Sequence, residues 1–196
     1  MIKLTIEGKK YEMASGWDEI YLTQFFEIYD IKDLEISELK KTLKIISVLS
    51  GIPMDILMTI NIDDLQAIDM SWITKDIPKN VEKIIKIEGK EYGIVKDIKK
   101  LSLGEYADCD EYGKDIRNLH YISAILLRPV TDKDGEMYMI EKYDSNTLEE
   151  RAKLFKEKLN IQQILGMNNF FLNSVNGSLK NLTNSSRKQA PKKEKK

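Results

Sequence analysis

The two residue types that most often act as bases and nucleophiles each occur once in this 196-residue chain. His120 lies on a predicted helix beside Tyr121. A lone imidazole acts as a base or a ligand only with a positioned partner, and the neighbouring sequence supplies none at a suitable spacing. We therefore expect His120 at the rim of the core. Cys109 stands between Asp108 and Asp110, and adjacent carboxylates raise the pKa of a thiol and suppress its nucleophilic thiolate. It is predicted to pack as a small apolar residue.

Two acidic segments have the oxygen atoms that hard cations prefer. The first contains Glu105, Asp108, Asp110 and Glu111. Only positions three or four apart share a helix face, so Asp108 and Glu111 qualify while Asp110 points elsewhere. A solvated acidic face is the interpretation that we favour. The second, Asp132–Gly135, has its glycine too early for a calcium loop and no glutamate at the required spacing, so it predicts a hairpin turn.

The sequence contains none of the motifs on which common active sites are built. It has no glycine-rich phosphate loop, no Gly-x-Ser-x-Gly element and no Cys/His set with metal-ligand spacing. We therefore expect no enzymatic activity, and no catalytic, cofactor-binding or metal-binding residue.

Aromatic residues crowd one predicted short helix and the end of the body. Some of them are expected in the core, and the rest are typical of a protein interface, where aromatic and methionine residues are enriched. The eight methionines fit either interpretation. The candidate partner-binding residues are Trp17, Tyr21, Phe25, Phe26, Tyr29, Phe170 and Phe171.

The net charge of −1 conceals an acidic body and a basic tail. Residues 174–196 carry seven cations and one anion, a charge of +6, which leaves −7 for residues 1–173. Few residues in this tail are apolar, so it is predicted to be disordered. It either solubilises the chain or makes non-specific contact with DNA or an acidic surface, because lysines displace phosphate counterions. The candidate contact residues are Arg187, Lys188, Lys192, Lys193, Lys195 and Lys196.

The remaining composition points to a reducing compartment. No apolar run approaches the ~20 residues that cross a bilayer, so no membrane contact is expected. The first residues lack the order of a signal peptide, and one cysteine cannot form an intramolecular disulfide. We expect the chain to work in a cytoplasm, or in a particle assembled there.

An internal duplication organises the sequence. Ile6–Tyr11 recurs as Ile87–Tyr92, and without a gap the match places Ile20 on Leu101 and Leu22 on Leu103. Further on, three segments match in the same order: Leu43–Leu49 with Leu119–Ile125, Pro53 with Pro129, and Ile60–Leu65 with Leu159–Ile164. We infer two copies, at residues 1–78 and 79–173.

The elements that each copy predicts are a β-hairpin and about three helices. The hairpins are expected at 2–13 and 85–95, with Gly8 and Gly89 in the turns. Ser102 and Glu105 have the spacing of a capping box, whereas Tyr21 replaces the serine in the first copy. The later helices are predicted at 37–50 and 62–73 in the first copy and at 116–127 and 161–172 in the second.

The second copy also contains a predicted insertion, a hairpin at 128–140 followed by a helix at 148–159. The fold class is therefore α+β and helix-rich. It consists of two tandem pseudo-symmetric repeats followed by a disordered tail at 174–196.

Three segments carry a resemblance to a known group of proteins: Ile87–Ile94, Leu103–Asp108 and Asn118–Pro129. In these segments the chain resembles virion-associated or assembly proteins of tailed phages, particularly crAss-like phages. The resemblance implies a non-enzymatic virion protein, placed near the portal or tail or packaged as cargo. It would be assembled in the bacterial host cytoplasm in many symmetric copies, with portal, tail or capsid proteins as partners.

Three hypotheses follow. The chain is a structural or cargo protein of the particle, held by aromatic and methionine surfaces. Alternatively, it is a tail-assembly chaperone that is absent from the mature virion. A third hypothesis is an acidic adaptor with no phage connection. The basic tail favours the first, because a packaged or portal-adjacent protein meets DNA.

Overall fold

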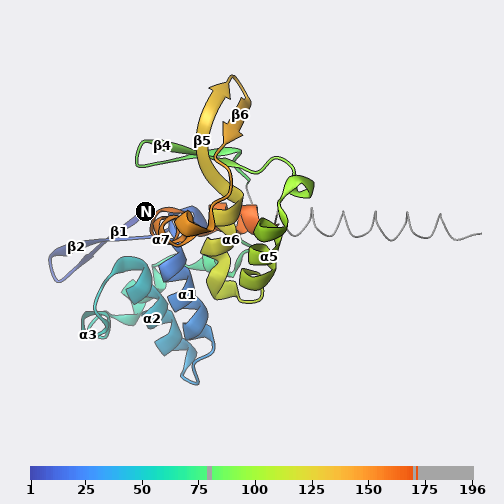
Figure 1. Cartoon of the computed structure of the whole chain (residues 1–196). Coiled ribbons are helices and arrows are strands. Elements are labelled where there is room, and N and C mark those ends of the chain that lie inside the picture. Colours follow the sequence, from blue (N-terminus) through green and yellow to red (C-terminus); the bar gives the residue numbers. More distant parts are fainter. Residues whose placement is uncertain (79–80, 170, 172–196) are drawn as a thin grey trace, which may run out of the picture.

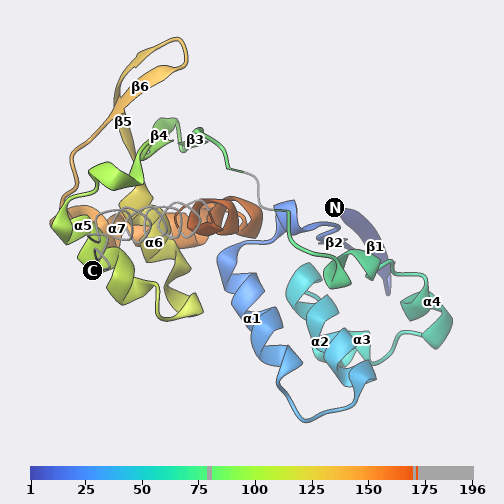
Figure 2. The same ribbon diagram turned by 90° about the vertical axis from the view of Figure 1, so that its right-hand side faces the viewer.

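The computed structural model describes residues 1–78, 81–169 and 171, and its fold is α+β (Figure 1). Residues 1–78 form a first lobe, and the described residues from 81 onward form a second lobe beside it (Figure 2). Phe170 and the predicted basic tail at 174–196 lie outside the described residues. Within those residues, no helix combines the length and the apolar character needed to cross a membrane.

The first lobe begins with a hairpin whose strands alternate between half-buried and exposed side chains, as predicted. The longest helix of the lobe begins where the Ser37 hydroxyl accepts a hydrogen bond from the Lys40 amide, and it ends at Gly51, with φ of 68°. In chain order the elements are β1 Ile2–Ile6, β2 Lys9–Met13, η1 Trp17–Glu19, α1 Leu22–Lys32, α2 Glu38–Ser50, α3 Met54–Leu57, α4 Ile62–Gln66 and η2 Ser71–Thr74.

The single helix predicted at 62–73 was wrong, because the chain forms two short helices there. Helix α4 ends at Gln66, and η2 begins only at Ser71. Between them, the Asp69 carboxylate accepts a hydrogen bond from the Ser71 amide at 2.9 Å. A short acidic side chain that binds the backbone locally competes with the helical hydrogen bonds, and here it interrupts them.

The second lobe repeats the hairpin and the two following helices and adds the predicted insertion. Its elements are β3 Ile84–Ile87, β4 Lys90–Ile94, η3 Ile98–Lys100, α5 Leu103–Tyr112, η4 Ile116–Asn118, α6 Leu119–Leu126, β5 Leu127–Asp134, β6 Met137–Ile140, η5 Ser145–Thr147 and α7 Leu148–Lys158, followed by helical residues 161–169. The order hairpin, 3₁₀ turn, helix, helix occurs in both lobes, which is consistent with the predicted duplication.

The inserted hairpin is confirmed, but its turn lies further along the chain than predicted. Asp134 pairs with Met137, so the turn is Gly135-Glu136 and not Asp132–Gly135. Strand β5 also pairs with β4, through Tyr92 opposite Pro129. The insertion therefore extends the repeat hairpin into a four-stranded sheet in the order β3-β4-β5-β6, and β5 and β6 project from the body (Figure 1).

The two repeat hairpins have the same turn conformation. Both central residues have positive φ, 50° at Glu7 and 76° at Gly8, then 49° at Glu88 and 86° at Gly89. This is the pattern of a type I′ turn, whose twist matches that of the flanking strands. A left-handed glutamate is uncommon, so its recurrence at equivalent positions supports a common origin for the two hairpins.

One backbone hydrogen bond joins the exit of each hairpin to the end of the second helix of its lobe. The Ala14 amide donates to the Leu49 carbonyl oxygen at 3.3 Å in the first lobe. In the second lobe, the Val95 amide donates to the Leu126 carbonyl oxygen at 2.8 Å. We call these two bonds the hairpin tethers.

The core extends through both lobes. In the first lobe Trp17 packs edge to face on Trp72, with ring centroids 5.2 Å apart. In the second, Phe155 of α7 is fully buried and packs edge to face on Tyr92 of β4, also at 5.2 Å. The added helix therefore supplies the apolar cover for the sheet. Its Arg151 donates from Nε to the Ala124 carbonyl oxygen at 2.8 Å, which fixes α7 on α6.

The lobes meet along a seam where α1 and the residues just before it face α7 and the segment after it (Figure 2). The Ile161 amide donates to the Ile20 carbonyl oxygen at 2.8 Å, and Tyr21 forms an isolated β-bridge with Asn160. Further along the seam, Arg117 lies 2.6 Å from the Asp30 carboxylate.

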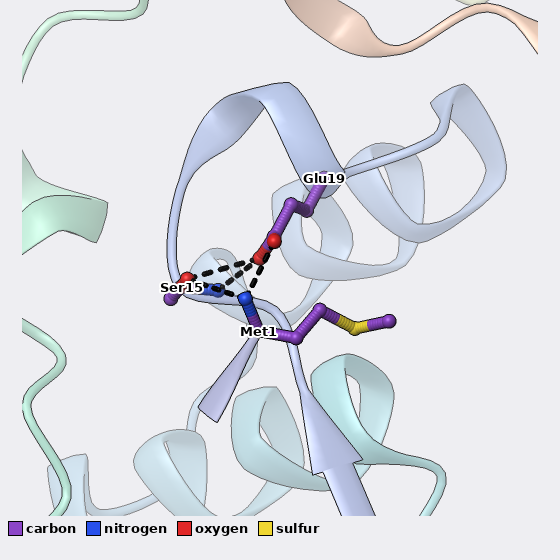
Figure 3. Close-up of polar contacts among 3 residues, drawn as sticks. All are labelled: Met1, Ser15 and Glu19. Carbon is purple, nitrogen blue, oxygen red and sulfur yellow. Dashed lines mark hydrogen bonds and ion pairs between the residues drawn. The ribbon is translucent and has the colours of Figure 1, made fainter. Parts of the chain in front are cut away.

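The start of the chain is held by polar contacts with η1 (Figure 3). The α-amino group of Met1 donates to the Glu19 carboxylate at 2.6 Å and to the Ser15 hydroxyl at 3.0 Å. The Ser15 amide donates to the other Glu19 oxygen at 2.7 Å. The hydrogen bond from the α-amino group is the main reason that the pKa of Glu19 lies below its usual value.

Gly93 allows the projecting hairpin to pack on β4. A Cβ atom at this position would lie 2.5 Å from Tyr138 Cε2 and 2.9 Å from Ile140 Cγ2. The buried Tyr138 ring rests there and donates its hydroxyl hydrogen to the Ile94 carbonyl oxygen at 2.8 Å. Any side chain at residue 93 must therefore displace the ring.

We predict that Gly93→Ala lowers the free energy of unfolding by about 1–3 kcal/mol through overpacking. The matched control is Gly104→Ala, because the nearest atom to a Cβ on helical Gly104 is the Ser102 hydroxyl at 4.0 Å. That substitution should stabilise the fold by about 0.5–1 kcal/mol. Urea denaturation measures both changes, and equal effects of the two variants would contradict the packing argument.

Candidate interaction surface

His120 is buried and is not positioned as a base. Its side chain is 9% exposed, and within the described residues Nδ1 has no hydrogen-bond partner. Burial lowers the pKa of His120 to about 4, and the nearby Lys156 adds to this effect. The imidazole is therefore neutral at pH 7, and it lies deeper than the core rim at which the sequence placed it.

Cys109 packs in the core, as predicted. It is 1% exposed, and burial together with the charges of Glu105 and Asp108 raises its pKa to about 12. A thiol with this pKa is protonated at physiological pH, so it does not supply a thiolate.

The predicted solvated acidic face was wrong for Glu105, which is 5% exposed. One of its carboxylate oxygens lies 3.0 Å from an Arg128 guanidinium nitrogen, and the other accepts a hydrogen bond from the Ser102 amide at 2.6 Å. The Ser102 hydroxyl accepts from the Glu105 amide, which completes the predicted capping box. Burial lowers the pKa of Arg128, and the Glu105 charge opposes this shift.

The other acidic residues of this segment do not gather around a common point. Asp108 accepts a hydrogen bond from the Tyr143 hydroxyl, and Asp110 pairs with Lys114 at 3.4 Å on the surface. Among the described residues, no group of three or more His, Cys, Asp or Glu side chains could hold a metal ion.

The predicted aromatic patch divides between the core, the seam and the surface. Trp17 and Phe171 are buried, while Phe25 and Phe26 are partly buried. Arg117 of the second lobe lies over the Phe26 ring, 5.8 Å from its centroid. Exposed rings remain at Tyr21 and Tyr29 alone among the predicted aromatics that the structure describes, with exposures of 46% and 43%.

A second set of exposed apolar residues, which was not predicted from the sequence, lies on the second lobe. Leu103 is 90% exposed at the start of α5, and Tyr106, one turn later, is 45% exposed. On β6, Met137 and Met139 are 67% and 65% exposed on either side of the buried Tyr138. In a strand, successive side chains point to opposite faces, so the sequence Met137-Tyr138-Met139 could have indicated that both methionines share one exposed face. We call Leu103, Tyr106, Met137 and Met139 the second-lobe apolar set.

An open groove of about 290 Å³ runs between β6 and the segment that leads to α5, lined by Ile94, Lys96, Lys100, Leu101, Arg128 and Met139 among others. Lys96 holds its wall in place, because its ammonium donates to the Tyr138 carbonyl oxygen at 2.9 Å and lies 4.0 Å from the Tyr138 ring centroid. Leu103 follows the groove residue Leu101 by two positions. The groove and the exposed residues near it can therefore receive an apolar segment of a partner.

Comparisons with models of protein families, with curated proteins and with solved structures find no match to this chain.

We predict that Glu105→Ala destabilises the fold by about 3–5 kcal/mol, because it leaves the Arg128 charge buried without its partner. Combining it with Arg128→Met should recover most of that loss, since the charge is then removed. Asp110→Ala on the exposed face of the same helix is the control, with an expected effect within about 0.5 kcal/mol. Chemical denaturation measures all three, and a double variant as unstable as Glu105→Ala would contradict the burial argument.

The buried His120 predicts a loss of stability in mild acid. The unfolded chain takes up a proton near the ordinary histidine pKa of 6.5, while the folded chain takes it up only near 4. Stability is therefore complete above pH 6.5 and falls as the pH drops from 6.5 towards 4, by about 1.4 kcal/mol per pH unit at most. His120→Leu should be about 2 kcal/mol more stable relative to the wild type at pH 5 than at pH 7.5. Urea denaturation at the two pH values tests this, and an unchanged difference would refute it.

Proposed function

We propose that this chain is a non-enzymatic component of a tailed-phage particle, either a structural protein near the portal or tail or packaged cargo. It acts through contacts with other phage structural proteins. The observation that carries the proposal is the second-lobe apolar set, above all Leu103 with 90% of its surface exposed. Met139 of this set lines the groove, and Leu103 follows the groove residue Leu101 by two positions. Exposed large apolar side chains at a groove are typical of surfaces that a partner covers. The resemblance in residues 87–129 supplies the phage setting.

The groove is built in a way that suits a docking role. The Lys96 and Tyr138 contacts and the Glu105–Arg128 pair hold its wall and floor before any partner arrives. A surface organised in advance loses less conformational entropy on binding. The basic residues of the tail, from Arg187 to Lys196, would add non-specific contact with packaged DNA.

Quantitative mass spectrometry of purified particles tests the proposal, using a phage whose genome encodes the chain. We expect the chain in every gradient-purified preparation, at a constant ratio to the major capsid protein. A non-virion protein from the same lysate is the control for contamination. Absence from the particles together with abundance in the infected cell would overturn the proposal and favour the tail-assembly chaperone. A chain encoded outside any phage genome would favour the adaptor.

A further inference from the structure

The contact between the lobes joins two short segments with defined roles. The acceptor segment is residues 20–22, whose Ile20 carbonyl oxygen receives the hydrogen bond from the Ile161 amide. The donor segment is residues 160–161, at the start of the last helical segment. Leu22 of the acceptor segment and Ile161 of the donor segment are both fully buried.

Under the predicted duplication, each segment has an equivalent in the other lobe. Residues 101–103 correspond to the acceptor segment, and residues 61–62 correspond to the donor segment. The local geometry agrees. The Ile20 amide donates to the Trp17 carbonyl oxygen at 3.4 Å, and the Leu101 amide donates to that of Ile98 at 3.2 Å. Asn61 and Asn160 both directly precede helical residues, but only Asn160 accepts a capping hydrogen bond, from the Gln163 amide at 2.9 Å.

In residues 101–103 and 61–62, the positions that correspond to the contact between the lobes have no partner within the described chain. Leu103 is 90% exposed where Leu22 is buried, and Ile62 is 62% exposed where Ile161 is buried. Within the part of the chain that the structure describes, no hydrogen bond reaches the Leu101 carbonyl oxygen and none leaves the Ile62 amide. The described part of the chain therefore has one copy of the acceptor and one copy of the donor that are not used within it.

We infer that the donor segment of one copy docks on the acceptor segment of a second copy and repeats between chains the contact that joins the lobes within a chain. The Ile62 amide then donates to the Leu101 carbonyl oxygen of the neighbour, and Ile62 and Leu103 bury each other. The charges of the two segments are complementary. Asp63 and Asp64 follow Ile62 in the donor, and Lys100 precedes Leu101 in the acceptor.

This association is head-to-tail. The two surfaces differ, so a dimer leaves one donor and one acceptor unused, and further copies add until a ring closes or a filament grows. The inference deepens the proposed function, on which it rests for its setting, because it identifies one partner of the second-lobe apolar set as another copy of the chain.

The test uses two variants of the full chain, Leu103→Asp and Ile62→Asp, in sedimentation experiments from about 10 μM to about 1 mM, a range that covers weak association. The wild type should gain mass with concentration, and each variant should stay monomeric. A one-to-one mixture of the two should form a dimer and nothing larger, because Leu103→Asp retains the donor and Ile62→Asp retains the acceptor. Their affinity for each other should exceed the self-affinity of either variant by at least about tenfold.

Leu39→Asp is the matched control, since Leu39 is also an exposed leucine in the first turn of a helix, 51% exposed on α2. It should associate as the wild type does, and circular dichroism should show that all three variants are folded. A monomeric wild type at the highest concentration, or an oligomer that survives in either variant alone, would overturn the inference. Particle mass spectrometry is a separate readout: self-association by a chain absent from particles refutes the proposed function alone, and a monomeric chain present in particles refutes this inference alone.

Discussion

The hairpin tethers are the constraint on which the rest of each lobe depends. A buried backbone amide must find an acceptor, and in both lobes the amide after the hairpin finds it at the carbonyl end of the second helix. This fixes the hairpin relative to the helix pair, but the chain leaves the tether differently in each lobe. In the first, Gly51 adopts a left-handed conformation and leads to Pro53 and α3. In the second, Leu127 is extended, so Pro129, which the alignment placed on Pro53, enters strand β5. After the tether, the first lobe therefore continues into short helices, whereas the second lobe continues into strand β5 of the four-stranded sheet.

A second interaction, from the third residue of the first helix, reinforces each tether. In α1 the Gln24 side chain accepts from the Tyr21 amide at 3.3 Å and donates to the Val48 carbonyl oxygen at 3.2 Å. In α5 the equivalent Glu105 also accepts from the N-cap amide, but a carboxylate cannot donate a hydrogen bond to a carbonyl. It pairs with Arg128 on β5 instead, because a buried charge is stable only with a close counter-charge. The neutral amide of Gln24 can therefore bind the carbonyl end of α2. The carboxylate of Glu105 requires the arginine that strand β5 supplies.

The sequence predicted those features that local chemistry determines. Gly8 and Gly89 marked the turns, and Ser37, Ser102 and Gly51 marked helix ends, because each acts through atoms within a few residues. The exposure of individual side chains could not be predicted in this way. Glu105 is buried because of Arg128, and Phe26 is covered by Arg117, 91 positions away. The turn was placed too early because the residues of the turn alone do not specify that Asp134 pairs with Met137, or that Tyr138 packs on Gly93. The exposed Leu103 could be recognised only by comparison with its buried equivalent, Leu22.

The strength of a head-to-tail contact follows from its size. Leu103 and Ile62 are 90% and 62% exposed, so their burial contributes about 2–5 kcal/mol, at about 1.5–3 kcal/mol for each fully exposed side chain. Association of two proteins costs at least about 4 kcal/mol in lost translational and rotational freedom, so one such contact gives a weak complex. In a closed ring the last copy binds through both its donor and its acceptor, and the second contact forms at a high effective concentration. Free chains would therefore associate weakly, whereas a template that holds several copies near one another would favour the closed ring. A contact of this strength forms where copies are already gathered and dissociates where they are dilute, so concentration of the chain on a template would control its assembly.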